Sequence, residues 1–235
     1  MKLIKVSPLY EIYLSEKDGE RKNMRKVLHN GKILYRFMDR LYIPDHVYNL
    51  KEDVVRELNN IREKYEISVI DKIFNDTVIK DSMKVLLSSL ESNSKVNVLD
   101  FGCGNGYAGE IIKTYIPEAH LFGVDIRKPL ERKLLSTYND FSVAKMDANL
   151  PYAGQFFDFI LAYFVFHFRV SDSQLDELRR VIKPNGVLFF NLINSTDFSI
   201  LKRLSDKGFY QINEIEISSS DNSCMGYFYK AFKQE

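Results

Sequence analysis

The sequence predicts an α/β protein built on a doubly wound parallel sheet. Strand and helix patterns alternate from about Val96 to Asn191, which is typical of successive βαβ units. Within this stretch, an apolar strand at 96–101 runs into three spaced glycines and then into a segment of helical composition, Tyr107 to Tyr115. The chain has 235 residues and 45% of them are hydrophobic, which is enough for one such domain and a modest addition.

The glycine-rich turn between this strand and this helix predicts a nucleotide-like ligand. Glycine has no Cβ and accepts positive φ, so the backbone can approach a ligand closely. The helix that follows presents free N–H groups and the positive end of its dipole to an anionic group. The glycines fit two frames. One, G-x-G-x-x-G, begins at Gly104 and has Asp125 downstream at a distance that suits a ribose; the other, D-x-G-x-G-x-G, runs from Asp100 to Gly106.

The second frame resembles motif I of the class I S-adenosylmethionine (SAM) dependent methyltransferases. Later segments resemble the type 11 group of that family in the same order: a second strand at 121–127, a third at 141–148, a fourth at 156–164, and a helix, turn and fifth strand at 178–190. The turn reads Lys183-Pro-Asn-Gly186 where the family more often has Lys-Pro-Gly-Gly, and asparagine also tolerates turn geometry. The resemblance covers about residues 95–192 and favours SAM over a dinucleotide.

The resemblance implies a set of residues that hold SAM and its product S-adenosylhomocysteine (SAH). Asp125 would bind both ribose hydroxyls, since a carboxylate offers two acceptor oxygens, and Ile126 would pack on the adenine. Asp147 would accept from the exocyclic amine of adenine, and the Ala148 N–H would reach a ring nitrogen. Tyr163 would touch the methionine part, with core packing as its other interpretation. The predicted cofactor set is Asp100, Gly102, Cys103, Gly104, Gly106, Asp125, Ile126, Asp147, Ala148 and Tyr163.

His167 is the candidate catalytic base. It lies just past the predicted fourth strand, and ligands bind outside the carboxyl ends of such strands. Its ordinary pKa suits removal of a proton from a phenol, an alcohol or an amine. The other interpretation is a histidine that anchors the loop after the strand. A base is needed only where the acceptor holds a proton, because SAM already carries the activated group.

The chain is expected to contain two regions, 1–90 and 91–235. In the second, strand-like runs at 210–217 and 225–232 predict an antiparallel hairpin at the C-terminal end of the Rossmann-like methyltransferase sheet. The sequence of region 1–90 predicts a small α+β section with a strand at 9–14, a hairpin from 32 to 43, and helices at 50–65 and 67–90. In the resembled family such segments often form a lid over the substrate. Tyr35 and Tyr42 are therefore candidate substrate residues, with half-buried packing as the other interpretation.

Charge and cysteine content narrow the function classes. The 33 Lys and Arg residues nearly balance the 32 Asp and Glu residues, so the whole molecule is not an electrostatic nucleic-acid binder. A basic stretch from Arg21 to Arg40 is either a clamp for an anionic substrate or RNA, or a solvated face. Cys103 and Cys224 give no disulfide framework, and no metal-binding motif is indicated. No apolar run suits a signal peptide or a membrane span, which predicts a cytoplasmic protein without membrane contact.

These observations together predict a SAM-dependent methyltransferase that acts on a small molecule, with O- or N-methylation favoured. Two alternatives stay open. One is an RNA or protein methyltransferase that recruits its substrate through the basic stretch in 1–90. The other is a non-catalytic SAM-binding subunit, since function belongs to the site and not to the fold. Nucleic acid is the less favoured partner, and the sequence is compatible with a homodimer.

Overall fold

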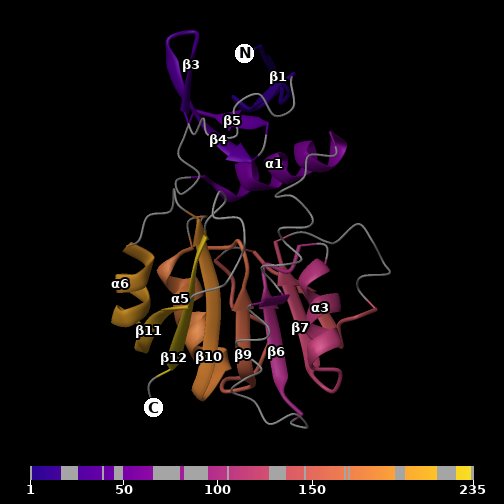
Figure 1. Ribbon diagram of the computed structural model, residues 1–235, viewed down its shortest axis with the longest axis vertical. Helices are drawn as coiled ribbons and strands as arrows, with labels where there is room; N and C mark the ends of the chain where they lie inside the picture. Colours follow the sequence, from indigo (N-terminus) through magenta and orange to yellow (C-terminus); the bar gives the residue numbers. More distant parts are fainter. Residues whose placement is uncertain are drawn as a thin grey trace. The chain divides into compact units, whose positions relative to one another are not determined.

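The computed structural model describes residues 2–16, 26–38, 40–44, 50–65, 80–81, 95–104, 106–126, 136–145, 147–166, 168, 170–193, 199–215 and 226–233. The chain divides into two compact units, Met1–Asn75 and Asp76–Glu235, drawn from indigo to violet and from magenta to yellow in Figure 1. The boundary predicted between residues 90 and 91 lies outside the described residues.

The first unit contains a five-stranded antiparallel sheet with the order β1-β2-β5-β4-β3 and a helix. Its elements are β1 (Leu3–Lys5), β2 (Tyr13–Ser15), β3 (Lys26–His29), β4 (Lys32–Met38), β5 (Leu41–Ile43) and α1 (Glu52–Lys64). The pairing of β4 with β5 confirms the hairpin predicted from 32 to 43. The helix predicted over 50–65 is α1, which buries Val55, Leu58 and Ile61 at helical spacing.

The strand predicted at 9–14 is wrong over most of its length, because β2 begins only at Tyr13. The Ser7 hydroxyl accepts hydrogen bonds from the backbone N–H groups of Leu9 at 3.3 Å and Tyr10 at 3.2 Å. The Tyr10 hydroxyl in turn donates to Asp53 of α1 at 2.7 Å. A serine that bonds the backbone two and three residues ahead favours a turn over an extended strand.

The second unit is built on a seven-stranded sheet with the order β11-β12-β10-β9-β6-β7-β8 (Figure 1). Its elements are β6 (Asn97–Phe101), α3 (Tyr107–Tyr115), β7 (His120–Asp125), β8 (Asp140–Val143), β9 (Phe157–Ala162), α5 (Asp172–Val181), β10 (Ile182–Ile193), α6 (Ser199–Asp206), β11 (Phe209–Ile215) and β12 (Gly226–Lys233). The neighbouring strands β10, β9, β6, β7 and β8 pair in parallel. Strand β12 pairs antiparallel with both β10 and β11. The α/β class with a largely parallel sheet is as predicted.

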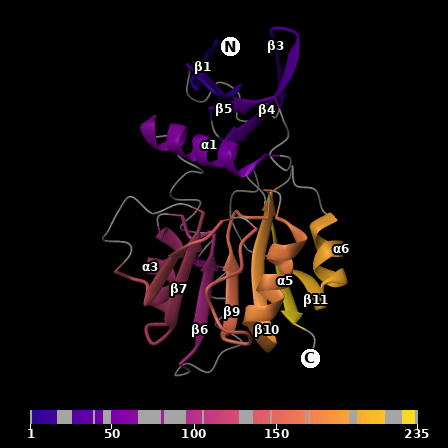
Figure 2. The ribbon, with the colours of Figure 1, turned by 180° about the vertical axis from the view of Figure 1, so that it is seen from behind.

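The chain leaves the centre of this sheet in two opposite directions. The connection through α3 moves from β6 to β7, whereas the connection through α5 moves from β9 to β10. Because such crossovers are right-handed, α3 and α5 cover opposite faces of the sheet. The two views in Figures 1 and 2 show α3 beside β7 and α6 at the β11 edge. This point of divergence, between β6 and β9, is where ligands bind in open α/β sheets.

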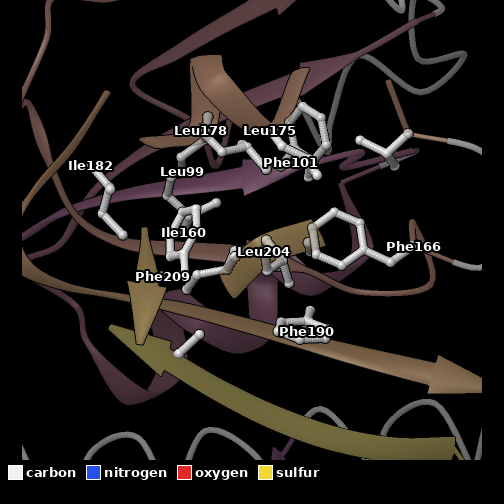
Figure 3. Packing of buried hydrophobic residues seen from close by; sticks show 14 of the residues in the cluster. Leu99, Phe101, Ile160, Phe166, Leu175, Leu178, Ile182, Phe190, Leu204 and Phe209 are labelled. Carbon is white, nitrogen blue, oxygen red and sulfur yellow. The ribbon is translucent and has the colours of Figure 1, made fainter. Parts of the chain in front are cut away.

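The largest core cluster lies between the sheet and the helices α5 and α6. Leu175 and Leu178 of α5 face Leu99 of β6 and Ile160 of β9, as Figure 3 shows, and all four are fully buried. Helix α5 begins with a capping box, in which the Ser171 hydroxyl accepts the Gln174 N–H while the Gln174 side chain accepts the Ser171 N–H. This packing fixes the strands whose carboxyl ends form the candidate site.

Two predicted segments differ in detail from the structure. The third strand, expected over 141–148, ends at Val143, whose register partner Asp125 is the last residue of β7. The turn at Lys183–Gly186 is a bulge inside β10: Ile182 pairs with Phe157 and Val187 with Phe159, so the intervening residues protrude. Asn185 there has a φ of 57°, the left-handed geometry expected of it.

Candidate functional site

The glycine turn lies at the carboxyl edge of the parallel sheet, directly over the end of β7. Gly102 N–H and Cys103 N–H both donate to the Val124 carbonyl, at 2.8 and 3.1 Å. The Gly106 N–H closes the turn on the Cys103 carbonyl at 2.8 Å, and α3 begins at the next residue. Parallel pairing of β6 with β7 therefore joins the predicted motif I turn to the acid that ends the second strand.

Three glycines of the turn have positive φ, namely 77° at Gly102, 55° at Gly104 and 82° at Gly106. Their surroundings differ. A Cβ at Gly102 would overlap with the Val165 side chain, which comes from the segment after β9. A Cβ at Gly104 would meet no atom within 4 Å. Gly102 therefore allows two segments to pack together, whereas Gly104 leaves an open space beside the backbone.

Asp125 lies beside that open space. Its Oδ2 accepts the Gly104 N–H at 2.8 Å, and the residue is half-buried. A carboxylate has two acceptor oxygens, which suits a ligand that carries neighbouring hydroxyl groups. Within the described residues, no side chain caps the first turn of α3, which begins at the same point. The role of Asp125 in binding a ribose stays a prediction.

Asp100 and Tyr138 form a buried pair beneath the turn. Asp100 is 2% exposed, and its Oδ2 accepts a hydrogen bond from the Tyr138 hydroxyl at 2.6 Å. Burial and, to a smaller extent, the nearby Asp125 carboxylate raise the pKa of Asp100 to about 7, against the lowering effect of this hydrogen bond. Burial also raises the pKa of Tyr138. Asp100 was predicted as a cofactor residue, and Tyr138 was not predicted at all.

The remaining predicted cofactor residues surround the turn and the ends of β7 and β8. Cys103 is buried, and Ile126 is half-buried immediately after β7. Asp147 is exposed in a turn after β8, and the Ala148 N–H donates to the Lys145 carbonyl at 3.1 Å. Tyr163 follows β9 and is buried, with its ring centroid 5.7 Å from that of Phe189. Their contacts with a cofactor stay predictions.

The catalytic and substrate candidates are described only in part. His167 lies outside the described residues. Tyr42 is 3% exposed within the first unit, and Tyr35 is half-buried there with Lys26 Nζ 5.2 Å from its ring centroid. Both environments agree with packing in the first unit's own sheet. Acceptor recognition by residues 1–90 and these two tyrosines stays a prediction.

Sequence reasoning missed a buried amide near the end of β10. Phe164 has a φ of 57°, and its N–H donates to Asn191 Oδ1 at 2.6 Å. Asn191 is 1% exposed, and its Nδ2 has no hydrogen-bond partner among the described residues. Its signal in the sequence is an amide within the otherwise apolar run 187–193, since a buried polar group requires a partner. Asn191 thus holds the turn after β9 through its Oδ1, while its Nδ2 group has no partner among the described residues.

The described part of the chain shows neither a metal-binding cluster nor a membrane-spanning helix. The described residues contain no group of three or more His, Cys, Asp or Glu side chains that could hold a metal ion. Among the described helices, none combines the length and the apolar composition that a membrane span requires.

Comparison with known proteins identifies the relatives of the second unit. Residues 99–190 match the family model described as a methyltransferase domain. The malonyl-[acyl-carrier protein] O-methyltransferase of Acetivibrio thermocellus is 27% identical over 115 residues, which are 48% of this chain and 41% of that protein. The ribosomal RNA small subunit methyltransferase C of Haemophilus influenzae is 31% identical over 78 residues, 30% of this chain and 24% of that protein. This chain therefore spans less than half the length of these curated relatives.

A solved structure extends the likeness in fold. It is the Burkholderia thailandensis 1,6-didemethyltoxoflavin-N1-methyltransferase with bound 1,6-didemethyltoxoflavin and SAH, with a TM-score of 0.61 and 13% identity. The alignment covers 90% of this chain and all of that one. At this identity the likeness concerns the fold alone. Together with the family match, it confirms the resemblance that the ordered motifs predicted.

Gly102→Ala is expected to destabilise the protein more than Gly104→Ala. Positive φ costs an alanine about 1–2 kcal/mol at either position. At Gly102 the overlap with Val165 adds about 1–3 kcal/mol. Chemical unfolding measures both changes. Gly104→Ala should instead weaken SAH binding in calorimetry, since its methyl group enters the open space, while the fold is retained. Equal destabilisation of the two variants would contradict this account of the turn.

The contribution of Asp100 to stability is expected to fall as the pH rises from about 4 to about 7, because its pKa is raised in the folded protein. The unfolded chain releases this proton near the ordinary value of 3.8, whereas the folded protein keeps it until about 7. The difference in the free energy of unfolding between wild type and Asp100→Asn should therefore drop by about 1.4 kcal/mol per pH unit across this window. Urea unfolding at several pH values measures it, and a constant difference would refute it.

Proposed function

We propose that this chain, whose residues 99–190 match the family model of a methyltransferase domain, transfers a methyl group from SAM to a small-molecule acceptor. The observation that carries the proposal is the meeting of the glycine turn with Asp125, where Gly104 N–H and the carboxylate lie 2.8 Å apart beside an open space. The curated relatives with methyltransferase names support it.

The residues of this chain bind and orient rather than supply the reactive group. SAM carries the activated methyl group when bound, so the protein's task is to align it with the acceptor and to exclude water. In the proposal, Asp125 accepts from the ribose hydroxyls and the bare backbone at Gly104 allows close approach. Ile126 packs on the adenine, and Asp147 accepts from its amine. These residues lie at the carboxyl ends of β6, β7 and β8 or shortly beyond them.

The proposed acceptor presents an oxygen or a nitrogen for methylation. Two relatives support this chemistry: one is named as an O-methyltransferase of malonyl-[acyl-carrier protein], and the fold neighbour is named as an N1-methyltransferase of a small heterocycle. A carboxylate acceptor would need no general base, whereas an alcohol or a protonated amine would.

An RNA substrate is the second candidate, favoured by the likeness to a ribosomal RNA methyltransferase. The described part of the basic stretch gives it little support. Lys32 pairs with Glu11 at 2.8 Å, and Lys26 lies over the Tyr35 ring. Salt dependence separates the two functions. Binding of an RNA falls steeply with rising salt because phosphate contacts release counterions, whereas a neutral small acceptor hardly responds.

Calorimetry with SAH is expected to detect binding that depends on Asp125. Asp125→Ala should weaken SAH binding by about 1–3 kcal/mol, since it removes hydrogen bonds to a charged group. Asp125→Asn should lose less, because one amide oxygen can still accept the Gly104 N–H.

The matched control for these variants is Asp140→Asn, an exposed carboxylate on β8, which should leave the affinity unchanged. Binding of NAD(H) but not of SAH would overturn the cofactor assignment. SAH binding without methyl transfer to any compound in a broad acceptor screen would favour the non-catalytic alternative.

His167→Gln is expected to lower kcat for an acceptor that must lose a proton, with the KM for SAM unchanged. In the wild type kcat should rise with pH through the ordinary pKa of a histidine, about 6.5, because only the neutral imidazole accepts a proton. The variant should lose that rise. His120→Gln, at an exposed position at the start of β7, is the control. An unaltered pH profile in His167→Gln would leave His167 as a residue that anchors its loop.

A further inference from the structure

Tyr138 is buried against α3 and the strands β6 and β7 of the second unit, although it belongs to none of the predicted motifs. Its hydroxyl donates to Asp100 Oδ2 at 2.6 Å. Its ring fills space that two glycines leave free: a Cβ at Gly109 of α3 would lie 2.6 Å from Tyr138 Oη, and a Cβ at Gly123 of β7 would lie 3.0 Å from Tyr138 Cδ1. The ring therefore lies against α3, which follows the glycine turn, and against β7, which pairs with β6.

We propose that Tyr138 is the positioning residue of the cofactor turn, which it holds in place through its hydrogen bond to Asp100. This inference rests on the proposed SAM site. Asp100 is the penultimate residue of β6, and Gly102 begins the turn one residue after that strand ends. A displacement of Asp100 therefore moves Gly102, which packs too closely against Val165 to accommodate a Cβ. It also moves Gly104, which lies beside the open space.

The hydroxyl matters because the carboxyl group that it holds has no access to water. Asp100 is 2% exposed, so an ionised carboxylate there needs a donor. Within the described residues, Tyr138 and Asp125 are the titratable groups that act on Asp100, and the Cys103 thiol acts on Tyr138. Asp125 carries a like charge and repels the ionised form. Tyr138 is thus the group that makes the buried charge tolerable above neutral pH.

Loss of the hydroxyl has a predictable consequence for binding. In Tyr138→Phe the ring still fills the space beside Gly109 and Gly123, but Asp100 loses its donor. The free protein can then relax the turn until water reaches the carboxylate. Binding of the cofactor has to reverse this relaxation and bury the unpaired charge again. The loss of affinity should therefore grow with pH, as more of Asp100 ionises.

The experiment is calorimetric titration of full-length protein with SAH at several pH values from about 6 to about 9. Tyr138→Phe should bind about tenfold more weakly than wild type at the high end, the size expected for a lost hydrogen bond to a charged group, and nearly equally at the low end. Tyr152→Phe is the matched control. Tyr152 is half-buried, and its hydroxyl lies 3.4 Å from the carbonyl oxygen of Gly123, the β7 residue that the Tyr138 ring also adjoins. Its affinity should stay within about twofold at every pH.

A second variant separates positioning from packing. In Asp100→Asn/Tyr138→Phe the buried group is a neutral amide that never ionises, so the pH-dependent part of the loss should disappear relative to Asp100→Asn alone. A Tyr138→Phe protein that is less stable but binds SAH like wild type at every pH would reduce Tyr138 to core packing and overturn the proposal. A wild type that binds no SAH would instead overturn the proposed function, and this inference with it.

Discussion

The backbone between β6 and α3 changes direction at Gly102–Gly106 while other segments of the second unit pack closely around it. Val165 occupies the space that a side chain at Gly102 would need, and Val124 and Asp125 accept N–H groups of the turn. These contacts fix the backbone at the point where Gly104 remains open. The candidate site therefore depends first on the close approach of backbone segments, which only glycine permits, and then on individual side chains.

Two carboxylates at the ends of adjacent parallel strands have different environments and so different roles. Asp100 is buried and hydrogen-bonded to Tyr138, whereas Asp125 is half-buried and accepts a backbone N–H beside the open space. Two like charges at close range are costly, and Asp125 contributes to the raised pKa of Asp100. The pair therefore concentrates negative charge on Asp125, the residue that we propose binds the ribose. Asp100 can then act as a structural support for the turn.

The parts of the fold that sequence could predict are those determined by local patterns. The helix Tyr107–Tyr115 has the predicted bounds, because the glycine turn ends directly before it and its own composition is helical. The early end of β8 was not predictable, since it depends on where its partner β7 ends. Nor was Tyr138, whose partner Asp100 lies 38 positions away and whose role arises only when β6, β7 and α3 pack together. Tertiary contacts of this kind leave no local pattern.

The same tyrosine explains why the glycines could be read in two frames. The G-x-G-x-x-G frame requires Gly109, which in dinucleotide folds allows close packing of helix and strand. Here the missing side chain of Gly109 makes room for the Tyr138 hydroxyl, and Gly123 on β7 makes room for the same ring. The positive φ values fall instead on Gly102, Gly104 and Gly106, the glycines of the D-x-G-x-G-x-G frame. That frame describes the left-handed turn itself, whereas the third glycine of the other frame meets the steric requirement of a buried tyrosine.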